Sequence, residues 1–143
     1  MKEKVAMNKD DIIDYYAEDY KIESYSYKMM GKLLEKEKVI SRLQKFNLQK
    51  VYIYGGGYLG VQLYLALKDS DAVQGIVDKS GGVSVDIAED IPAFTVEQLM
   101  ERYQNEAIII TPVRYYSQIK NSLSSQIPED NILFLGEFLE GVV

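Results

Sequence analysis

A chain of 143 residues, with 47% hydrophobic and 27% charged side chains, has the size and composition of one compact domain. Its net charge of −6 argues against a nucleic-acid or anionic-membrane partner, because both attract basic surfaces. The absence of cysteine and histidine excludes disulfides, thiolate metal sites, cysteine nucleophiles and imidazole acid–base chemistry. What remains is chemistry by carboxylate, Tyr, Lys or Ser side chains, or binding without a reaction.

Residues 1–47 are rich in charged side chains and tyrosine, and predict a helical N-terminal extension. A short helix is predicted over 8–20, a break at Ser24 and Ser26, and a longer helix over 27–47. The longer helix has an apolar face made of Met29, Met30, Leu33, Ile40 and Leu43. The chain shows no apolar run of the roughly 20 residues that a membrane span needs, so we expect a cytoplasmic protein.

Tyrosine is unusually dense in this extension, with five residues between Tyr15 and Tyr27. One interpretation is that these rings pack the helices onto the following domain. The other is a contact with a second copy of the chain or with a partner domain, since tyrosine is enriched at interface cores.

Residues 48–143 alternate short apolar runs with helical patterns and predict one α/β domain. Strands are predicted over 50–54, 72–78, 91–94, 107–111 and 131–135. Helices are predicted over 57–68, 95–104 and 112–125, with a short helical tail from Gly136. Strands that alternate with helices form a parallel sheet, so we expect a doubly wound, three-layer α/β sandwich of about five parallel strands.

One crossover of this sheet is too short for an ordinary helix. Residues 79–90 contain Gly81, Gly82 and several acidic residues. A loop or a small hairpin is therefore expected there, with a short strand over 83–85.

A glycine motif of the form Gly-x-Gly-x-x-Gly joins the first strand to the first helix of this domain. Gly55 allows a tight turn, Gly57 lets a diphosphate approach the backbone amides, and Gly60 lets the helix pack closely. The helix N-terminus adds N–H groups and a partial positive charge. The candidate ligand contacts are Gly55, Gly56, Gly57, Tyr58, Leu59 and Gly60. The alternative is that these glycines only shape a tight connection.

An acidic residue ends the next strand, as the motif requires. Asp78 lies 23 residues after Gly55, near the spacing at which a carboxylate accepts hydrogen bonds from ribose hydroxyls. Its charge would repel a 2′-phosphate and so favours NAD over NADP, although the adjacent Lys79 weakens this preference. The alternative is that Asp78 merely ends a strand.

A second group of candidate contacts follows the fourth strand. Ligands of open parallel sheets bind where the strand order reverses, which here lies between the first and fourth strands. Thr111 and Arg114 are therefore expected to face the glycine loop. Arg114 could grip a phosphate or a sugar carboxylate, or could be an ordinary solvated arginine.

Tyr116 and Lys120 match the Tyr-x-x-x-Lys pair of short-chain dehydrogenases. In that family the tyrosine donates a proton, and the lysine lowers its pKa. The pair follows the glycine loop too closely and lies on the wrong helix, so we interpret it as a coincidence.

The chain resembles the Rossmann-like domains of bacterial polysaccharide and glycan biosynthesis in the stretches VYIYGGGYLGVQLYLALK, GIVDKS, IPAFTVEQL, AIIIT and NILFL. These domains include the sugar-nucleotide-binding domains of UDP-sugar acetyltransferases and domains attached to sugar epimerases, dehydratases and methyltransferases. The resemblance implies a nucleotide or sugar nucleotide bound at Gly55, Gly56, Gly57, Tyr58 and Asp78. It does not extend to the acyltransferase β-helix or to a catalytic histidine, so acetyl transfer is not expected.

Three functional hypotheses follow. The first is a nucleotide-binding module of a glycan pathway that holds NAD or a UDP-type sugar nucleotide and is non-catalytic alone. The second is a small NAD-dependent oxidoreductase or epimerase acting on a nucleotide sugar, with Asp78 on the ribose and Tyr58 or Tyr116 near the substrate. The third is a ligand-free scaffold that assembles through the tyrosine-rich helices.

Overall fold

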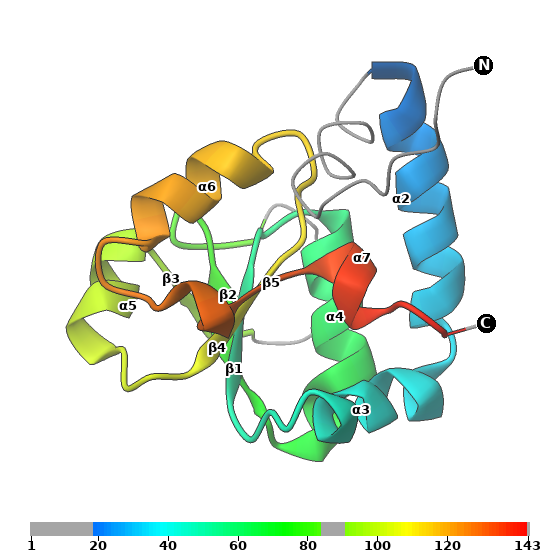
Figure 1. The fold of residues 1–143 in the computed structure, drawn as a ribbon, viewed down its shortest axis with the longest axis horizontal. Coiled ribbons are helices and arrows are strands. Elements are labelled where there is room, and N and C mark those ends of the chain that lie inside the picture. Colours follow the sequence, from blue (N-terminus) through cyan, green and yellow to red (C-terminus); the bar gives the residue numbers. More distant parts are fainter. Residues whose placement is uncertain (1–18, 84–90, 143) are drawn as a thin grey trace, which may run out of the picture.

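The computed structural model describes residues 19–83 and 91–142 (Figure 1). Almost all of the helix predicted over 8–20 lies outside these residues, as does most of the short strand predicted over 83–85. Of the crossover between the second and third strands, the described residues 78–83 and 91–92 form turns and loop without a helix.

The five expected strands form one parallel sheet. They are β1 (Val51–Tyr54), β2 (Val73–Val77), β3 (Ala93–Phe94), β4 (Ala107–Ile110) and β5 (Ile132–Phe134). Their order is β3-β2-β1-β4-β5, so the chain moves outward from β1 to β3 and then crosses back to β4. The strand order therefore reverses between β1 and β4, as predicted for a doubly wound sheet.

Helices cover both faces of this sheet. They are α4 (Tyr58–Leu67), α5 (Val96–Arg102), α6 (Tyr116–Leu123) and α7 (Leu135–Phe138), with 3₁₀ turns η1 (Lys68–Ser70) and η2 (Glu129–Asn131). Figure 1 shows α5 and α6 on one side, and α4 and α7 on the other. The central strands β1 and β4 are buried along their whole length, because helices lie over both faces. The fold is a Rossmann-like three-layer sandwich.

Two helix starts show how local signals compare with tertiary structure. Thr95 caps α5 as predicted: its hydroxyl accepts a hydrogen bond from the N–H of Gln98, and the Gln98 side chain accepts one from the N–H of Thr95. The prediction that a helix begins at Pro112 was wrong, because residues 112–115 form a loop and α6 begins at Tyr116.

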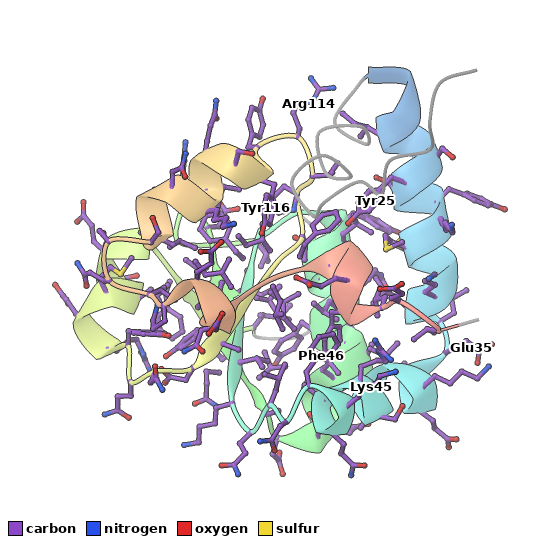
Figure 2. All side chains as sticks on the ribbon, in the orientation of Figure 1. Tyr25, Glu35, Lys45, Phe46, Arg114 and Tyr116 are labelled. Atoms are coloured by element: carbon purple, nitrogen blue, oxygen red, sulfur yellow. The ribbon has the colours of Figure 1, made fainter. Side chains whose placement is uncertain are left out.

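The predicted division of the N-terminal helices was also wrong. The chain is helical through Ser24 and Ser26, in α2 (Asp19–Leu33), and it turns at Leu34 and Glu35 before α3 (Lys36–Lys45). Serine is only a moderately poor helix former, and the buried residues around it hold the helix together. The turn near Glu35, labelled in Figure 2, redirects the chain so that both helices contact α4.

The N-terminal helices and the sheet share one hydrophobic core. Tyr25 stacks on Phe134 of β5 with ring centroids 5.5 Å apart, and Tyr116 of α6 meets the same ring edge-on at 5.4 Å. Figure 2 shows Tyr25 and Tyr116 entering the interior from their two helices. Packing is thus the role of Tyr25, whereas Tyr27 is 84% exposed.

Two cations from these helices bind the C-terminal part of the chain. Lys32 donates a hydrogen bond to the carbonyl of Leu139 at 3.2 Å, and Arg42 donates one to the carbonyl of Phe138 at 2.6 Å. The last carbonyls of a helix accept no hydrogen bond from within that helix. The side chains of Lys32 and Arg42 supply donors at this place and so stabilise the C-terminal end of α7.

Within the described residues, none of the helices has the length and apolar character that crossing a membrane requires.

Candidate functional site

The glycine loop lies at the carboxyl edge of the sheet, where the strand order reverses. Gly55 follows β1 with a φ of +115°, a backbone conformation that residues other than glycine rarely adopt. A Cβ atom at this position would lie 2.5 Å from the Thr111 hydroxyl and 3.0 Å from Pro112, both of which follow β4. Only glycine therefore lets the ends of β1 and β4 approach this closely.

Gly60 allows the close packing that the motif predicts. A Cβ atom there would collide with the carbonyl of Gly55, which lies five residues earlier, in the loop before α4. Gly56 is restricted by a different neighbour, because its Cβ atom would lie 2.5 Å from the carbonyl of Gly82. The loop after β2 thus covers Gly56, which gives this glycine a packing role that the motif alone does not indicate.

Gly57 differs from its neighbours, because a Cβ atom there would meet no atom of the described residues within 4 Å. It is the N-cap of α4 and offers no side-chain hydrogen bond to the helix. None of the described residues accepts a hydrogen bond from the N–H groups of Gly57, Tyr58 or Leu59. The first turn of α4 therefore presents backbone donors and a partial positive charge beside open space.

The carboxylate of Asp78 joins the end of β2 to this loop. Its Oδ2 atom accepts a hydrogen bond from the N–H of Gly56 at 2.8 Å, and its Oδ1 atom accepts two from the N–H and the hydroxyl of Ser80. Burial acts to raise the pKa of Asp78, but these hydrogen bonds and the charge of Lys79 outweigh it. The net pKa is lowered, so the group is ionised at neutral pH.

Thr111 follows β4 and bonds to the main chain of Tyr54, the last residue of β1. The Thr111 hydroxyl, which is buried, donates to the carbonyl of Tyr54 at 2.8 Å. Tyr54 ends β1, and burial together with the negative charge of Asp78 raises its pKa. Tyr54 therefore keeps its phenolic proton at neutral pH.

A cleft follows the carboxyl edge on both sides of the glycine loop, and it has two lobes. The α6 lobe, of about 560 Å³, is lined by Tyr54, Gly55, Asp78, Lys79, Pro112, Tyr115, Gln118, Ile119 and Ser122. The α2 lobe, of about 480 Å³, is lined by Ser26, Met30, Gly55, Gly56, Gly57, Tyr58, Leu59, Gly60, Asp78, Thr111 and Pro112. Three residues belong to both linings, namely Gly55, Asp78 and Pro112, so one molecule could contact both lobes.

The structure brings together most of the residues that the sequence predicted. Gly55 to Gly60, Asp78, Lys79 and Thr111 all line the cleft. Arg114 does not: it is exposed in the loop between β4 and α6 and belongs to neither lining (Figure 2).

The surroundings of Tyr116 and Lys120 indicate a structural role for both residues. Tyr116 is 1% exposed in the core, and Lys120 forms an ion pair with Glu129 at 2.9 Å. Neither residue lines the cleft in the described part of the chain. The interpretation of this pair as a coincidence agrees with that placement.

Among the described residues, sequence reasoning missed eight that line the cleft: Tyr54, Pro112, Ile119, Ser26, Met30, Tyr115, Gln118 and Ser122. The last three repeat at helical spacing directly after β4, a signal that could have placed them on one face of α6. No local pattern marks Ser26 or Met30, because their position depends on how α2 packs against α4.

Comparison of the chain with protein-family models, with curated proteins and with solved structures finds no match. The resemblance to domains of glycan biosynthesis accordingly remains a prediction from the quoted stretches of sequence.

Proposed function

We propose that the cleft binds a nucleotide joined through a diphosphate to a second group, of the NAD or UDP-sugar type. The observation that carries this proposal is the cleft, whose two lobes meet at Gly55, beside the open space at Gly57. As the resemblance implies, the chain would serve as a binding module of bacterial glycan biosynthesis, without a reaction of its own.

The diphosphate would lie at the first turn of α4. The N–H groups of Gly57, Tyr58 and Leu59 point out of a helix end that has no side-chain cap. Backbone donors at a helix N-terminus bind phosphate oxygens well, and the helix dipole favours their negative charge. The missing side chain of Gly57 leaves room for the phosphates to reach these donors.

The nucleoside would lie in the α6 lobe. Tyr115 is 55% exposed there and offers an aromatic face for a base, while Gln118 and Ser122 offer polar groups to its edge. A carboxylate has about four acceptor sites. Asp78 uses three of them within the protein, which leaves it one for a ribose hydroxyl.

Binding is favoured over catalysis by the titratable groups of the cleft. The pKa of Asp78 is lowered and that of Tyr54 is raised, so both move away from neutrality. A general acid or base works best with a pKa near the working pH. These two groups are therefore suited to holding charge and shape rather than to exchanging protons.

Thermal unfolding with added nucleotides tests this proposal. A ligand present at 100 times its Kd stabilises the native state by about 2.7 kcal/mol, which raises the midpoint of this chain by roughly 5–10 °C. We expect NAD⁺ or UDP-glucose to cause such a shift in the wild type and in Gly31→Val, but not in Gly57→Val.

The two variants are matched, because at both Gly31 and Gly57 the added Cβ would have no atom within 4 Å in the part of the chain that the structure describes. Equal shifts in both variants would exclude the glycine loop as the site. Oxidation of NADH in the presence of a keto-sugar nucleotide would instead support the oxidoreductase hypothesis.

A further inference from the structure

Helix α2 forms one wall of the cleft, although it precedes the doubly wound sheet and is not one of its crossover helices. Tyr25, Met29 and Leu33 recur every four residues and are buried. Residues one position further along a helix lie about 100° around its axis. Ser26 and Met30 occupy that next stripe, and both line the α2 lobe opposite the first turn of α4.

The position of this wall is set by contacts away from the cleft. Tyr25 stacks on Phe134 with an interplanar angle of 11°, and Lys32 holds the carbonyl of Leu139. Ser26 and Met30 directly follow the buried residues Tyr25 and Met29. They are therefore presented to the lobe by a helix that is already held near its middle, at Tyr25, and near its C-terminal end, at Lys32.

The two lobes differ in chemistry. In the α6 lobe, Lys79, Gln118 and Ser122 offer polar groups to a ligand. In the α2 lobe, the side chains of Met30 and Leu59 are apolar, and Pro112 is common to both lobes.

Two polar side chains of the α2 lobe, those of Thr111 and Asp78, already form hydrogen bonds within the protein. The Thr111 hydroxyl donates to Tyr54, and Asp78 accepts from Gly56 and Ser80. Beside Thr111 and Asp78, the described lining of this lobe has two polar side chains, the hydroxyls of Ser26 and Tyr58. A hexose would place several hydroxyl groups against this lining, where few side chains could pair with them.

We propose that α2 determines ligand specificity: Ser26 and Met30 contact the group beyond the diphosphate, and this group is a flat heteroaromatic ring rather than a hexose. The proposal rests on the proposed function and narrows its ligand to the dinucleotide class. Methionine makes favourable contacts with aromatic rings, which suits Met30 to such a ring.

Three probes separate the parts of such a ligand: ADP, ADP-ribose, which lacks the ring, and NAD⁺, which carries it. Calorimetric titration of the wild type should give a Kd for NAD⁺ about tenfold below that for ADP-ribose, since a ring contact contributes about 1.4 kcal/mol. UDP-glucose should bind more weakly than NAD⁺.

Two neighbouring substitutions provide the matched test. Ser26→Trp places a large ring on the α2 wall of the lobe, whereas Tyr27→Trp places the same side chain at a position that is 84% exposed. We expect Ser26→Trp to abolish the preference for NAD⁺ over ADP-ribose and to leave the Kd for ADP within twofold. Tyr27→Trp should bind all three probes as the wild type does.

Met30→Ser is a second variant, which keeps the buried stripe of α2 intact and should reduce the NAD⁺ preference to about threefold or less. It decides the test if Ser26→Trp does not fold. A wild type that binds ADP-ribose and NAD⁺ equally, or UDP-glucose more tightly, would overturn the specificity proposal and leave the proposed function standing. So would identical binding by Ser26→Trp and Tyr27→Trp. Absence of binding by every probe would overturn both.

Discussion

The carboxylate of Asp78 and the backbone N–H of Gly56 lie 2.8 Å apart, and their hydrogen bond joins the end of β2 to the loop that follows β1. An acidic residue at this place was expected to meet a ribose. In this protein Asp78 stabilises the glycine loop, because two of its three hydrogen bonds are accepted from backbone N–H groups, those of Gly56 and Ser80. The shape of the glycine loop thus depends on a side chain from the neighbouring strand.

Replacing this carboxylate should reduce stability in a pH-dependent way. We expect Asp78→Asn to lower the free energy of unfolding at pH 7 by about 1–2 kcal/mol, because charge-assisted hydrogen bonds become neutral ones. The pKa of Asp78 is lower in the folded state than in the unfolded chain. Its contribution is therefore complete above the unfolded pKa of about 4 and is lost as the pH falls through the folded pKa.

Urea unfolding at several pH values measures this effect. The difference between the wild type and Asp78→Asn should narrow below pH 4, on the acid side of the unfolded pKa. Asp130→Asn, at an exposed position, is the control and should match the wild type within about 0.5 kcal/mol. A difference that stays constant down to pH 2 would show that the lowered pKa does not contribute.

Two glycines of the same loop should respond differently to the same substitution. Gly60→Ala places a methyl group against the carbonyl of Gly55, whereas Gly57→Ala places one in open space. Forcing an extra methyl into a packed site costs about 1–3 kcal/mol. We expect a loss at the upper end of that range for Gly60→Ala, and only about 0.5–1 kcal/mol for Gly57→Ala, because alanine is a poorer N-cap than glycine. Chemical denaturation of the two variants side by side measures the contrast; equal losses would contradict this account of the loop.

The ring of Phe134 connects α2 with α6 through Tyr25 and Tyr116. Phe134→Ala should therefore lower the free energy of unfolding by about 3–5 kcal/mol, as is usual for a buried aromatic residue. Tyr27→Ala removes an equally large side chain from a position that is 84% exposed, and should change stability by no more than about 0.5 kcal/mol. Thermal unfolding followed by circular dichroism distinguishes the two, and a mild effect of Phe134→Ala would show that α2 is held by other contacts.

The guanidinium of Arg42 should stabilise the end of α7. Its Nε atom donates to the carbonyl of Phe138 at 2.6 Å, and its cation lies 5.3 Å from the centre of the Phe46 ring. Arg42→Met keeps the apolar stem but removes the donor and the charge, so we expect a loss of about 1–2 kcal/mol in the free energy of unfolding. Lys36→Met, at an exposed position of the same helix, is the charge-matched control. If both variants lose the same stability, net charge rather than this hydrogen bond is responsible.

The strands of the sheet were predictable because each is a short apolar run between turn residues. All four residues of β4 are buried, which is the environment that a continuous run such as 107–111 indicates. The N-terminal helices were less predictable. Serine at positions 24 and 26 suggested a break, but the chain turns near Glu35, where the turn allows both helices to pack against α4.

The steric roles of Gly55 and Gly60 could be inferred from the spacing of the motif, since glycine is the residue that permits a positive φ and a close approach. The second bonding role of Asp78 could not, because it depends on the distance between two strand ends.

By itself, the sequence determined the alternation of strands and helices, the parallel sheet and the position of the glycine loop, because these follow from local apolar periodicity and from backbone freedom at single residues. Only the tertiary structure decided that Asp78 holds Gly56, that Arg114 lies outside the cleft, and that Ser26 and Met30 form one of its walls. Such relationships join residues that are distant along the chain, and the packing of whole helices against the sheet sets them.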